Sequence, residues 1–211
     1  MRITEIYASI QGETQYAGIP CTLVRTTGCD LRCSYCDTTY AFSGGREMSV
    51  DEVMLEVRRL GLSAVTLTGG EPMLQAEIAA LAARLVREGF RVTLETSGAH
   101  PVAHLPSAVI RIVDIKTPGS GEVERIFWDV LHGLRPQDAI KFVLSDESDY
   151  LWAAEVVRSR GLSGRAELLF SPATGKLDPR DLAAWILRDR LPVRLNLQLH
   201  KYIWGPETRG V

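Results

Sequence analysis

The stretch GCDLRCSYCDT, residues 28–38, holds three of the four cysteines in the chain and governs how the rest of the sequence is interpreted. Cys29, Cys33 and Cys36 follow the spacing Cys-x3-Cys-x2-Cys. A disulfide would leave one of these thiols unpaired, and a structural zinc ion usually takes four ligands from two separated pairs. A cubane [4Fe–4S] cluster suits three thiolates better, because one of its irons then stays open to a ligand that is not cysteine.

The remaining metal-binding residue types do not complete a zinc site in the sequence. Cys21 lies inside a predicted strand, where a small buried core residue is the ordinary interpretation. The four histidines, at positions 100, 104, 132 and 200, form no zinc-like pairing with the cysteines. A catalytic zinc ion with three protein ligands is the alternative that the spacing leaves open.

The bulk composition is that of an ordinary globular chain, so we expect a single domain over residues 1–211. The formal net charge of −2 predicts no broad basic surface and therefore no direct contact with nucleic acid. No apolar run approaches the roughly 20 residues of a membrane helix, and the first residues do not resemble a signal peptide. We therefore expect a cytoplasmic protein with reduced thiols and no membrane contact.

Short β-branched runs alternate with longer amphipathic runs along the chain, and Ser49 with Glu52 forms a predicted helix start. This alternation predicts parallel βαβ units, about six of them, so the expected fold is α/β with an incomplete (βα)6-type partial TIM barrel, or else an open sheet. We expect strands at 21–26, 64–68, 91–95, 109–115, 140–144, 166–170 and 193–199, and helices at 50–60, 75–88, 123–131, 150–160 and 178–188.

Polar motifs follow five of the predicted strands, where ligands bind in parallel α/β folds. They are TTGC (26–29), TGGEP (68–72), ETSG (95–98), DIKTPGSG (114–121) and SPATG (171–175). Because the carboxyl ends of parallel strands meet at one edge, these motifs should surround a single site.

TGGEP lacks the Lys-Ser/Thr of a phosphate loop, and a carboxylate at its turn would repel phosphate. Gly70 allows close backbone approach, and Glu71 adds the negative charge that suits an ammonium group. The alternatives are that TGGEP is a plain turn and that Lys116, a natural partner for a carboxylate, is an exposed lysine.

The cysteine spacing after the first predicted strand, combined with TGGEP, resembles the radical SAM superfamily. The resemblance implies that S-adenosylmethionine (SAM) binds the open iron and is cleaved to a 5′-deoxyadenosyl radical. Carried onto this sequence, it places Tyr35 near the adenine. The residues expected to contact SAM are Tyr35, Cys36, Asp37, Gly70, Glu71, Ser97, Asp114, Lys116 and Ser171.

Four further segments resemble the 7-carboxy-7-deazaguanine synthase family of deazapurine (queuosine precursor) biosynthesis. They are SIQGET (9–14), TLVRTTGC (22–29), CDTTY (36–40) and QLHKYIWGPETRGV (198–211). The resemblance implies conversion of 6-carboxy-5,6,7,8-tetrahydropterin to 7-carboxy-7-deazaguanine with loss of ammonia. The radical would remove a hydrogen from the carbon that bears the carboxylate, and Mg²⁺ would assist the ring contraction.

Transferred residue by residue, the resemblance makes Thr38 the Mg²⁺ ligand. It assigns the pterin substrate to Ile10, Gln11, Gly12, Glu13, Arg25 and Thr68. It also implies an electron donor such as flavodoxin or ferredoxin, and a homodimer. The plainer alternatives are that Gln11 and Glu13 are ordinary loop residues, that Arg25 is a surface strand residue, and that Thr38 caps a helix.

Two other functions remain open from the sequence. An activating enzyme for a glycyl radical enzyme shares the cysteine spacing and a similar length, but does not need the QGE loop, Arg25 or Thr38. A non-catalytic iron–sulfur or zinc protein would not need TGGEP and the aligned polar strand ends. The C-terminal segment with His200, Lys201 and Trp204 should pack near the site or form a subunit contact.

Overall fold

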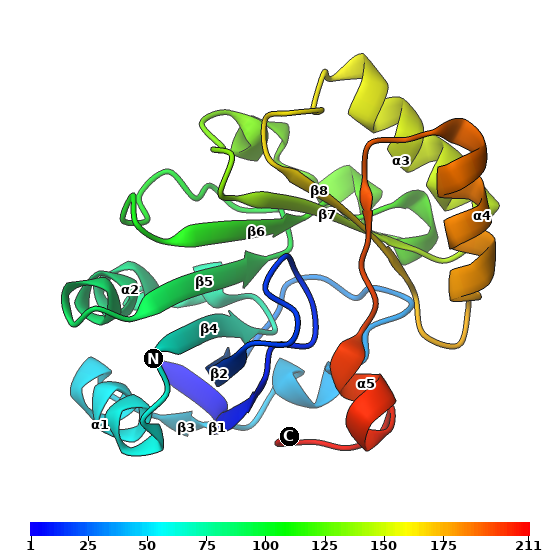
Figure 1. The fold of residues 1–211 in the computed structure, drawn as a ribbon. Coiled ribbons are helices and arrows are strands. Elements are labelled where there is room, and N and C mark those ends of the chain that lie inside the picture. The colour runs from blue at the N-terminus through cyan, green and yellow to red at the C-terminus, as the bar shows by residue number, and fades with distance from the viewer.

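Nine strands form one curved sheet in the order β3-β1-β2-β4-β5-β6-β7-β8-β9 in the computed structural model, which describes residues 1–211 (Figure 1). The strands from β2 to β9 run parallel to one another, while β1 pairs antiparallel with β2 and β3. Their bounds are β1 Arg2–Ile10, β2 Pro20–Thr26, β3 Arg46–Glu47, β4 Ala64–Gly69, β5 Arg91–Thr96, β6 Ile110–Asp114, β7 Ala139–Leu144, β8 Glu167–Pro172 and β9 Arg194–Leu195.

Five α-helices complete the fold, and α1 to α4 cover the outside of the curved sheet (Figure 1). They are α1 Val50–Leu60, α2 Ile78–Arg87, α3 Glu147–Ser159, α4 Pro179–Asp189 and α5 Leu199–Trp204. The predicted start of α1 is confirmed, because Ser49 and Glu52 form a capping box. None of the helices is long and apolar enough to cross a membrane.

Three predictions about local structure were incomplete or wrong. The strand β1 was not predicted at all. The helix expected at 123–131 is instead two short 3₁₀ helices, Val123–Arg125 and Trp128–Leu131. The backbone N–H of Phe127 explains this difference, because it donates to the carbonyl of Gly98 at 3.0 Å rather than to an i−4 carbonyl.

The strand expected at 193–199 is also shorter than predicted, since only Arg194–Leu195 pair with β8. Leu199 then starts α5, and its backbone N–H donates to the carbonyl of Gly12 at 2.7 Å. The segment between Cys36 and α1 contains no α-helix; it holds a 3₁₀ helix at Thr39–Phe42 and the strand β3.

The two faces of the sheet carry different side chains because successive residues of a strand alternate in direction. Toward the helices lies the main core of 37 buried residues, which includes Leu67 and Leu94. Toward the inside lies a small separate cluster made by Ile110, Ile112, Ala139 and Leu169, against which Tyr16 packs. The inner face therefore has an apolar base, and its polar residues are free to form a site.

The barrel is incomplete, because β3 and β9 are the two edges of the sheet and do not pair with each other. The N-terminal loop after β1 and the C-terminal segment after β9 lie side by side on the open side of the sheet (Figure 1). These two segments cover the open side of the incomplete barrel, and they bring residues from both ends of the chain to one place.

Candidate active site

A cavity of about 670 Å³ lies on the inner side of the sheet and is lined from the cysteine loop, the strand ends and both chain-terminal segments. This confirms that the polar motifs converge on one site. The predicted residues in its wall are Ile10, Gln11, Gly12, Glu13, Arg25, Cys29, Cys33, Tyr35, Cys36, Asp37, Thr38, Thr68, Gly70, Ser97, Asp114 and Lys116.

The cysteine loop leaves β2 through Gly28, whose φ of 99° lies in the left-handed region that favours glycine. Its carbonyl accepts the backbone N–H of Glu71 at 2.7 Å, so the TGGEP turn supports the cysteine loop. Gly70 is required at this contact, because a Cβ there would collide with the carbonyl of Gly28. The two motifs that suggested a radical SAM site are therefore parts of one packed unit.

The thiols suit a multi-iron cluster better than a single metal ion. Cys29, Cys33 and Cys36 are free and partly accessible at the cavity wall, whereas Cys21 is buried in β2 as predicted. No three His, Cys, Asp or Glu side chains are grouped as the ligands of one metal ion. Cysteines that bind different irons of a cubane need not converge in that way. Burial raises the pKa of the Cys33 thiol to about 11.

Three polar atoms next to the cysteine loop are buried without a hydrogen-bond partner. They are Oη of Tyr35, Oγ of Ser97 and Oδ1 of Asp114, and all three residues line the cavity. Buried polar groups in folded proteins are normally paired, so orphaned atoms around a cavity indicate the place of a polar ligand. Each of them belongs to a residue that was predicted to contact SAM.

Lys116 is the cation of this part of the site, and its Nζ lies 3.1 Å from Oδ2 of Asp114. Burial alone would lower the pKa of Lys116, but the charge of Asp114 outweighs it and holds the pKa above its usual value. The lysine is therefore not the exposed residue of the alternative interpretation, and it stays charged at the cavity wall.

Two residues of the predicted SAM set do not line the cavity. The buried carboxylate of Glu71 accepts from Oγ1 of Thr96 at 2.8 Å and from backbone N–H groups of Ser97 at 2.7 Å and Met73 at 2.9 Å. Ser171 is buried and its hydroxyl donates to Asn196 at 3.3 Å. In this structure both side chains hold neighbouring segments, and their contacts with SAM stay predictions.

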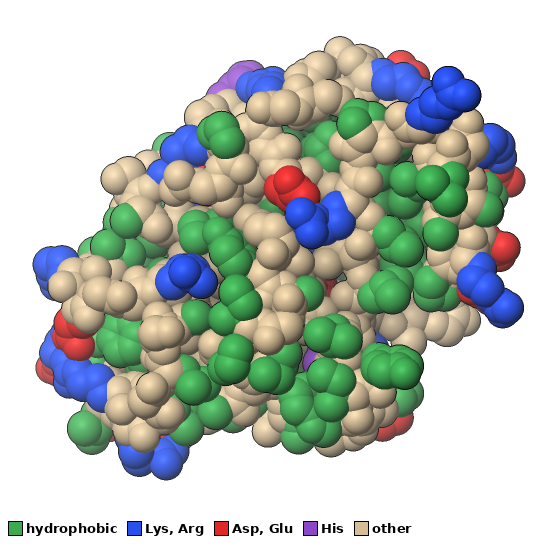
Figure 2. Space-filling view, viewed as in Figure 1, with side chains coloured by type: hydrophobic (Ala, Val, Ile, Leu, Met, Phe, Trp, Pro, Cys, Tyr) green, Lys and Arg blue, Asp and Glu red, His purple; other side chains and the backbone are tan.

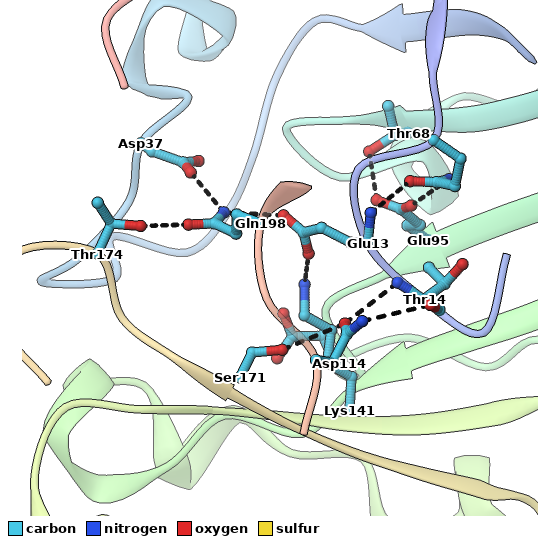
Figure 3. A network of polar contacts seen from close by, with 12 residues as sticks. Glu13, Thr14, Asp37, Thr68, Glu95, Asp114, Lys141, Ser171, Thr174 and Gln198 are labelled. Carbon is cyan, nitrogen blue, oxygen red and sulfur yellow. Dashed lines mark hydrogen bonds and ion pairs between the residues drawn. The ribbon is translucent and has the colours of Figure 1, made fainter. Parts of the chain in front are cut away.

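The predicted substrate loop reaches the cavity floor in a continuous polar network (Figure 3). Glu13 forms an ion pair with Lys141, and its other oxygen accepts from Nε2 of Gln198 at 2.8 Å. Desolvation alone would raise the pKa of Glu13, but the charge of Lys141 holds it below its usual value. Glu13 is thus an ionised carboxylate held by Lys141 and Gln198, and not an ordinary loop residue.

The pKa of Glu95, at the end of β5, is shifted in the opposite direction to that of Glu13. Its carboxyl accepts from Nε2 of Gln11 at 3.3 Å and from Oγ1 of Thr68 at 3.2 Å. Desolvation and the nearby negative charge of Glu13 raise the pKa of Glu95 above its usual value. Two carboxyl groups of the same cavity therefore have pKa values shifted in opposite directions, and perturbed pKa values in a cleft are typical of functional sites.

Gly12 and His200 are in close contact where the two chain-terminal segments meet. A Cβ at position 12 would collide with the imidazole of His200, so a larger residue there would displace that side chain. Desolvation lowers the pKa of His200 below its usual value. The C-terminal segment therefore packs at the site, which was one of the two arrangements expected from the sequence.

Arg25 points toward the cavity but is already held by protein groups. Its Nε donates to Oε1 of Glu5 at 2.7 Å, and Tyr40 donates to the same oxygen at 2.8 Å. Its Nη2 lies 3.5 Å from Oη of Tyr7. The side chain is largely buried, so Arg25 is not a surface residue.

Thr38 lies at the mouth of the cavity and its hydroxyl donates to Oδ1 of Asp37 at 2.9 Å. It precedes the 3₁₀ helix Thr39–Phe42 but makes no side-chain cap to it, so the capping alternative is not supported. Desolvation would raise the pKa of Asp37, but Lys201, Gln198 and the Thr38 hydroxyl lower it. The hydroxyl oxygen of Thr38 keeps its lone pairs for a cation, as the predicted Mg²⁺ ligand requires.

Several residues of the cavity were missed from the sequence. Lys141 had a usable signal, because it is the one charged residue in the apolar strand run 140–144. Glu95 lay inside a motif that was noted, but its own role was not singled out. Gln198 begins the C-terminal motif that was noted, but its contact with Glu13 was not predicted. Glu5 had no signal, because the strand β1 that carries it was not predicted.

Comparison with known proteins gives the class of protein first. Residues 23–115, from β2 to just beyond β6, match the family model of the radical SAM superfamily. The three-cysteine loop and the parallel partial barrel agree with that match, so the fold and site define a radical SAM enzyme.

Full-length relatives then give the family. The 7-carboxy-7-deazaguanine synthase of Koribacter versatilis is 49% identical, with 100% of both chains covered. The 7-carboxy-7-deazaguanine synthase of Chlorobaculum tepidum is 45% identical over 100% of this chain and 97% of that protein. The chain belongs to the 7-carboxy-7-deazaguanine synthase family, which decides against the glycyl radical activating enzyme.

Solved structures agree on the fold. The crystal structure of QueE from Escherichia coli superposes with a TM-score of 0.77 over 94% of both chains at 21% identity. SuiB from Streptococcus suis, solved with the precursor peptide SuiA, gives a TM-score of 0.59 at 12% identity, over 83% of this chain and 47% of that one. The expected partial barrel of the radical SAM kind is thereby confirmed.

Proposed function

We propose that this protein converts 6-carboxy-5,6,7,8-tetrahydropterin to 7-carboxy-7-deazaguanine with loss of ammonia. The observation that supports this most directly is that the cysteine loop, the orphaned polar atoms and the Gln11–Glu13 loop line one cavity. When bound, the cluster and SAM would supply the 5′-deoxyadenosyl radical, which removes a hydrogen atom from the carbon that bears the carboxylate. The residues of this chain then have to place that carbon correctly.

The cluster and SAM would be held on one side of the cavity. Cys29, Cys33 and Cys36 would bind three irons, and the unpartnered groups of Tyr35 and Ser97 would pair with the polar groups of SAM. A buried polar atom that stays unpaired costs free energy, so binding of a matching ligand relieves that cost.

The pterin would be held on the other side, at the floor. Glu13 is an ionised acceptor, and Glu95 is a second carboxyl whose pKa is raised by burial and by the charge of Glu13. The amide of Gln11 lies beside Glu95, to which its Nε2 donates at 3.3 Å. Arg25, whose Nε is fixed by Glu5, would present its remaining N–H groups to the substrate carboxylate.

We assign the Mg²⁺ ligand to Thr38, and the substrate and water would supply the other oxygen ligands. The metal would hold the substrate carboxylate and stabilise negative charge during ring contraction. Thr38→Ala should weaken the rate response to added Mg²⁺ and leave iron content unchanged. An unchanged Mg²⁺ response would remove Thr38 from the metal site.

The decisive experiment is anaerobic turnover of the reconstituted enzyme with SAM, a reductant and carboxytetrahydropterin. We expect 7-carboxy-7-deazaguanine and ammonia in equal amounts. SAM cleavage without this product would refute the substrate and keep the radical SAM chemistry. Absence of iron and acid-labile sulfide after anaerobic purification would refute the cluster assignment as well.

We also propose a homodimer, an electron donor of the flavodoxin or ferredoxin type and a cytoplasmic location. An apolar patch supports the dimer: Leu187 on α4, Leu197 before α5, and Tyr202 and Ile203 on α5 are exposed, Tyr202 to 89%. Hydrophobic side chains gather over this side of the molecule in Figure 2. Light scattering of Tyr202→Glu beside the unchanged protein tests this surface, and identical masses would exclude it as the contact.

A further inference from the structure

Thr14 has an unusual backbone conformation directly after the proposed substrate loop. Its φ of 65° lies in the left-handed region, which a β-branched residue rarely adopts. The residue is buried, and it immediately follows Glu13, whose carboxylate forms part of the cavity floor. Such a conformation persists only where surrounding contacts enforce it, and it is concentrated at functional sites.

Within the loop, Oγ1 of Thr14 accepts from the backbone N–H of Tyr16 at 3.1 Å and its carbonyl accepts from that of Ala17 at 3.4 Å. The contacts from outside the loop come from the other end of the chain. The backbone N–H of Thr14 donates to Oδ1 of Asn196 at 3.1 Å, and Nδ2 of Asn196 donates to the carbonyl of Thr14 at 3.2 Å. These two hydrogen bonds to the Thr14 backbone lie next to the Glu13 network in Figure 3. A single amide side chain therefore binds both polar groups of one peptide residue that lies 182 positions away.

Asn196 is itself held in place by hydrogen bonds to the neighbouring strand. It is buried just after β9, its backbone N–H donates to the carbonyl of Phe170 at 2.9 Å, and its Oδ1 also accepts from Ser171. It is also the only asparagine in the sequence. A planar amide is the one side chain of this size that offers a donor and an acceptor side by side.

We propose that Asn196 is a positioning residue, which locks Thr14 in its left-handed conformation and thereby directs Gln11 and Glu13 at the substrate. This inference rests on the proposed function, since it assumes that the Gln11–Glu13 loop binds the pterin. Without Asn196, the loop would keep the Leu199–Gly12 hydrogen bond but would lose the restraint at Thr14. Thr14 would then relax toward an ordinary φ, and the carboxylate of Glu13 would move away from its place at the cavity floor.

The test is a set of four variants of the reconstituted enzyme: Asn196→Ala, Thr14→Gly, the double variant and Gln15→Ala. Asn196→Ala should raise KM for carboxytetrahydropterin about tenfold, equivalent to about 1.4 kcal/mol of binding free energy. It should leave iron content and the rate of SAM cleavage without pterin unchanged. Glycine adopts positive φ freely, so the double variant should return KM to within about threefold of Thr14→Gly alone.

Gln15→Ala is the matched control, because Gln15 also lies in this loop and its amide donates outward to the carbonyl of Gln137 at 3.0 Å. Its KM should stay within about twofold of the unchanged enzyme. An unchanged KM in Asn196→Ala, or a double variant no better than Asn196→Ala, would overturn the proposal. Absence of product from the unchanged enzyme would instead refute the proposed function, so the two failures can be told apart.

If Asn196→Ala does not fold, Thr14→Gly decides the matter by its thermal unfolding midpoint. The substitution gives up the hydrogen bond from the Tyr16 N–H to Oγ1 of Thr14 but relieves the left-handed strain, so the midpoint should be kept. A clear loss would mean that Thr14 is not strained and that Asn196 has nothing to enforce.

Discussion

Replacement of Lys141 by methionine tests the charge arrangement at the floor of the cavity. The side chains of Lys141 and Glu13 are only 11% and 14% exposed, so their ion pair is largely removed from water. Removing one partner of a buried pair leaves an uncompensated charge, which typically costs about 3–5 kcal/mol. At about 2–4 °C per kcal/mol for a protein of this size, Lys141→Met should lower the unfolding midpoint by about 6–20 °C.

The effect depends on pH in a way that identifies its source. The pKa of Glu13 is lowered in the folded protein, so the stability from its ionised form is present above the ordinary carboxyl pKa of about 4.3. That contribution is lost as pH falls through the folded pKa. The difference between Lys141→Met and the unchanged protein should therefore shrink in acid and be full at pH 7.

Thermal unfolding of the cluster-loaded protein, followed anaerobically by circular dichroism, measures this effect. Glu13→Gln combined with Lys141→Met removes both charges and is the matched control. The double variant should regain at least half of the lost stability. A loss below about 1 kcal/mol in Lys141→Met, or no recovery in the double variant, would refute the argument that the two charges are buried as a pair.

Three other substitutions give simple outcomes. Cys33→Ala should abolish reductive cleavage of SAM, measured as 5′-deoxyadenosine; retained cleavage would place the cluster elsewhere. Glu95→Gln should be more stabilising, relative to the unchanged protein, at pH 8 than at pH 4. A raised folded pKa means that the native protein resists deprotonation of Glu95, which glutamine avoids, and the gain accrues between the ordinary carboxyl pKa of about 4.3 and the folded pKa. An equal difference in denaturation midpoint at both pH values would contradict this. Glu5→Leu should raise KM for the pterin by about tenfold through loss of the Arg25 contact, with SAM cleavage unchanged; an unaltered KM would show that Arg25 needs no support from Glu5.

The parallel sheet could be predicted because its signals are local. Strands with apolar residues and helices with amphipathic spacing alternate along the chain, and the capping box at Ser49 and Glu52 is complete within four residues. The strand and helix predictions that were wrong concern segments whose structure depends on distant partners. The N–H of Phe127 is diverted to Gly98, and Leu199 is drawn to Gly12, and no local pattern records either contact.

The site divides in the same way. Spacing within one loop predicts Cys29, Cys33 and Cys36 as the cluster ligands, because the three proposed ligands are close in sequence. The packing of Gly70 against Gly28 follows from two motifs whose strands, β2 and β4, are neighbours in the sheet.

The tertiary structure decided the other half of the site. Glu13 becomes a fixed charge only because β7 brings Lys141 beneath it and the C-terminal segment brings Gln198 beside it. The left-handed backbone of Thr14 is likewise met by a distant residue, because Asn196 supplies two hydrogen bonds to it from the far end of the chain. The sequence by itself indicated the cofactor chemistry, because the cysteine spacing and the TGGEP turn are short motifs that resemble those of the radical SAM superfamily. The tertiary structure decided how the proposed substrate residues are held, because charge pairing and backbone strain depend on which segments meet in space.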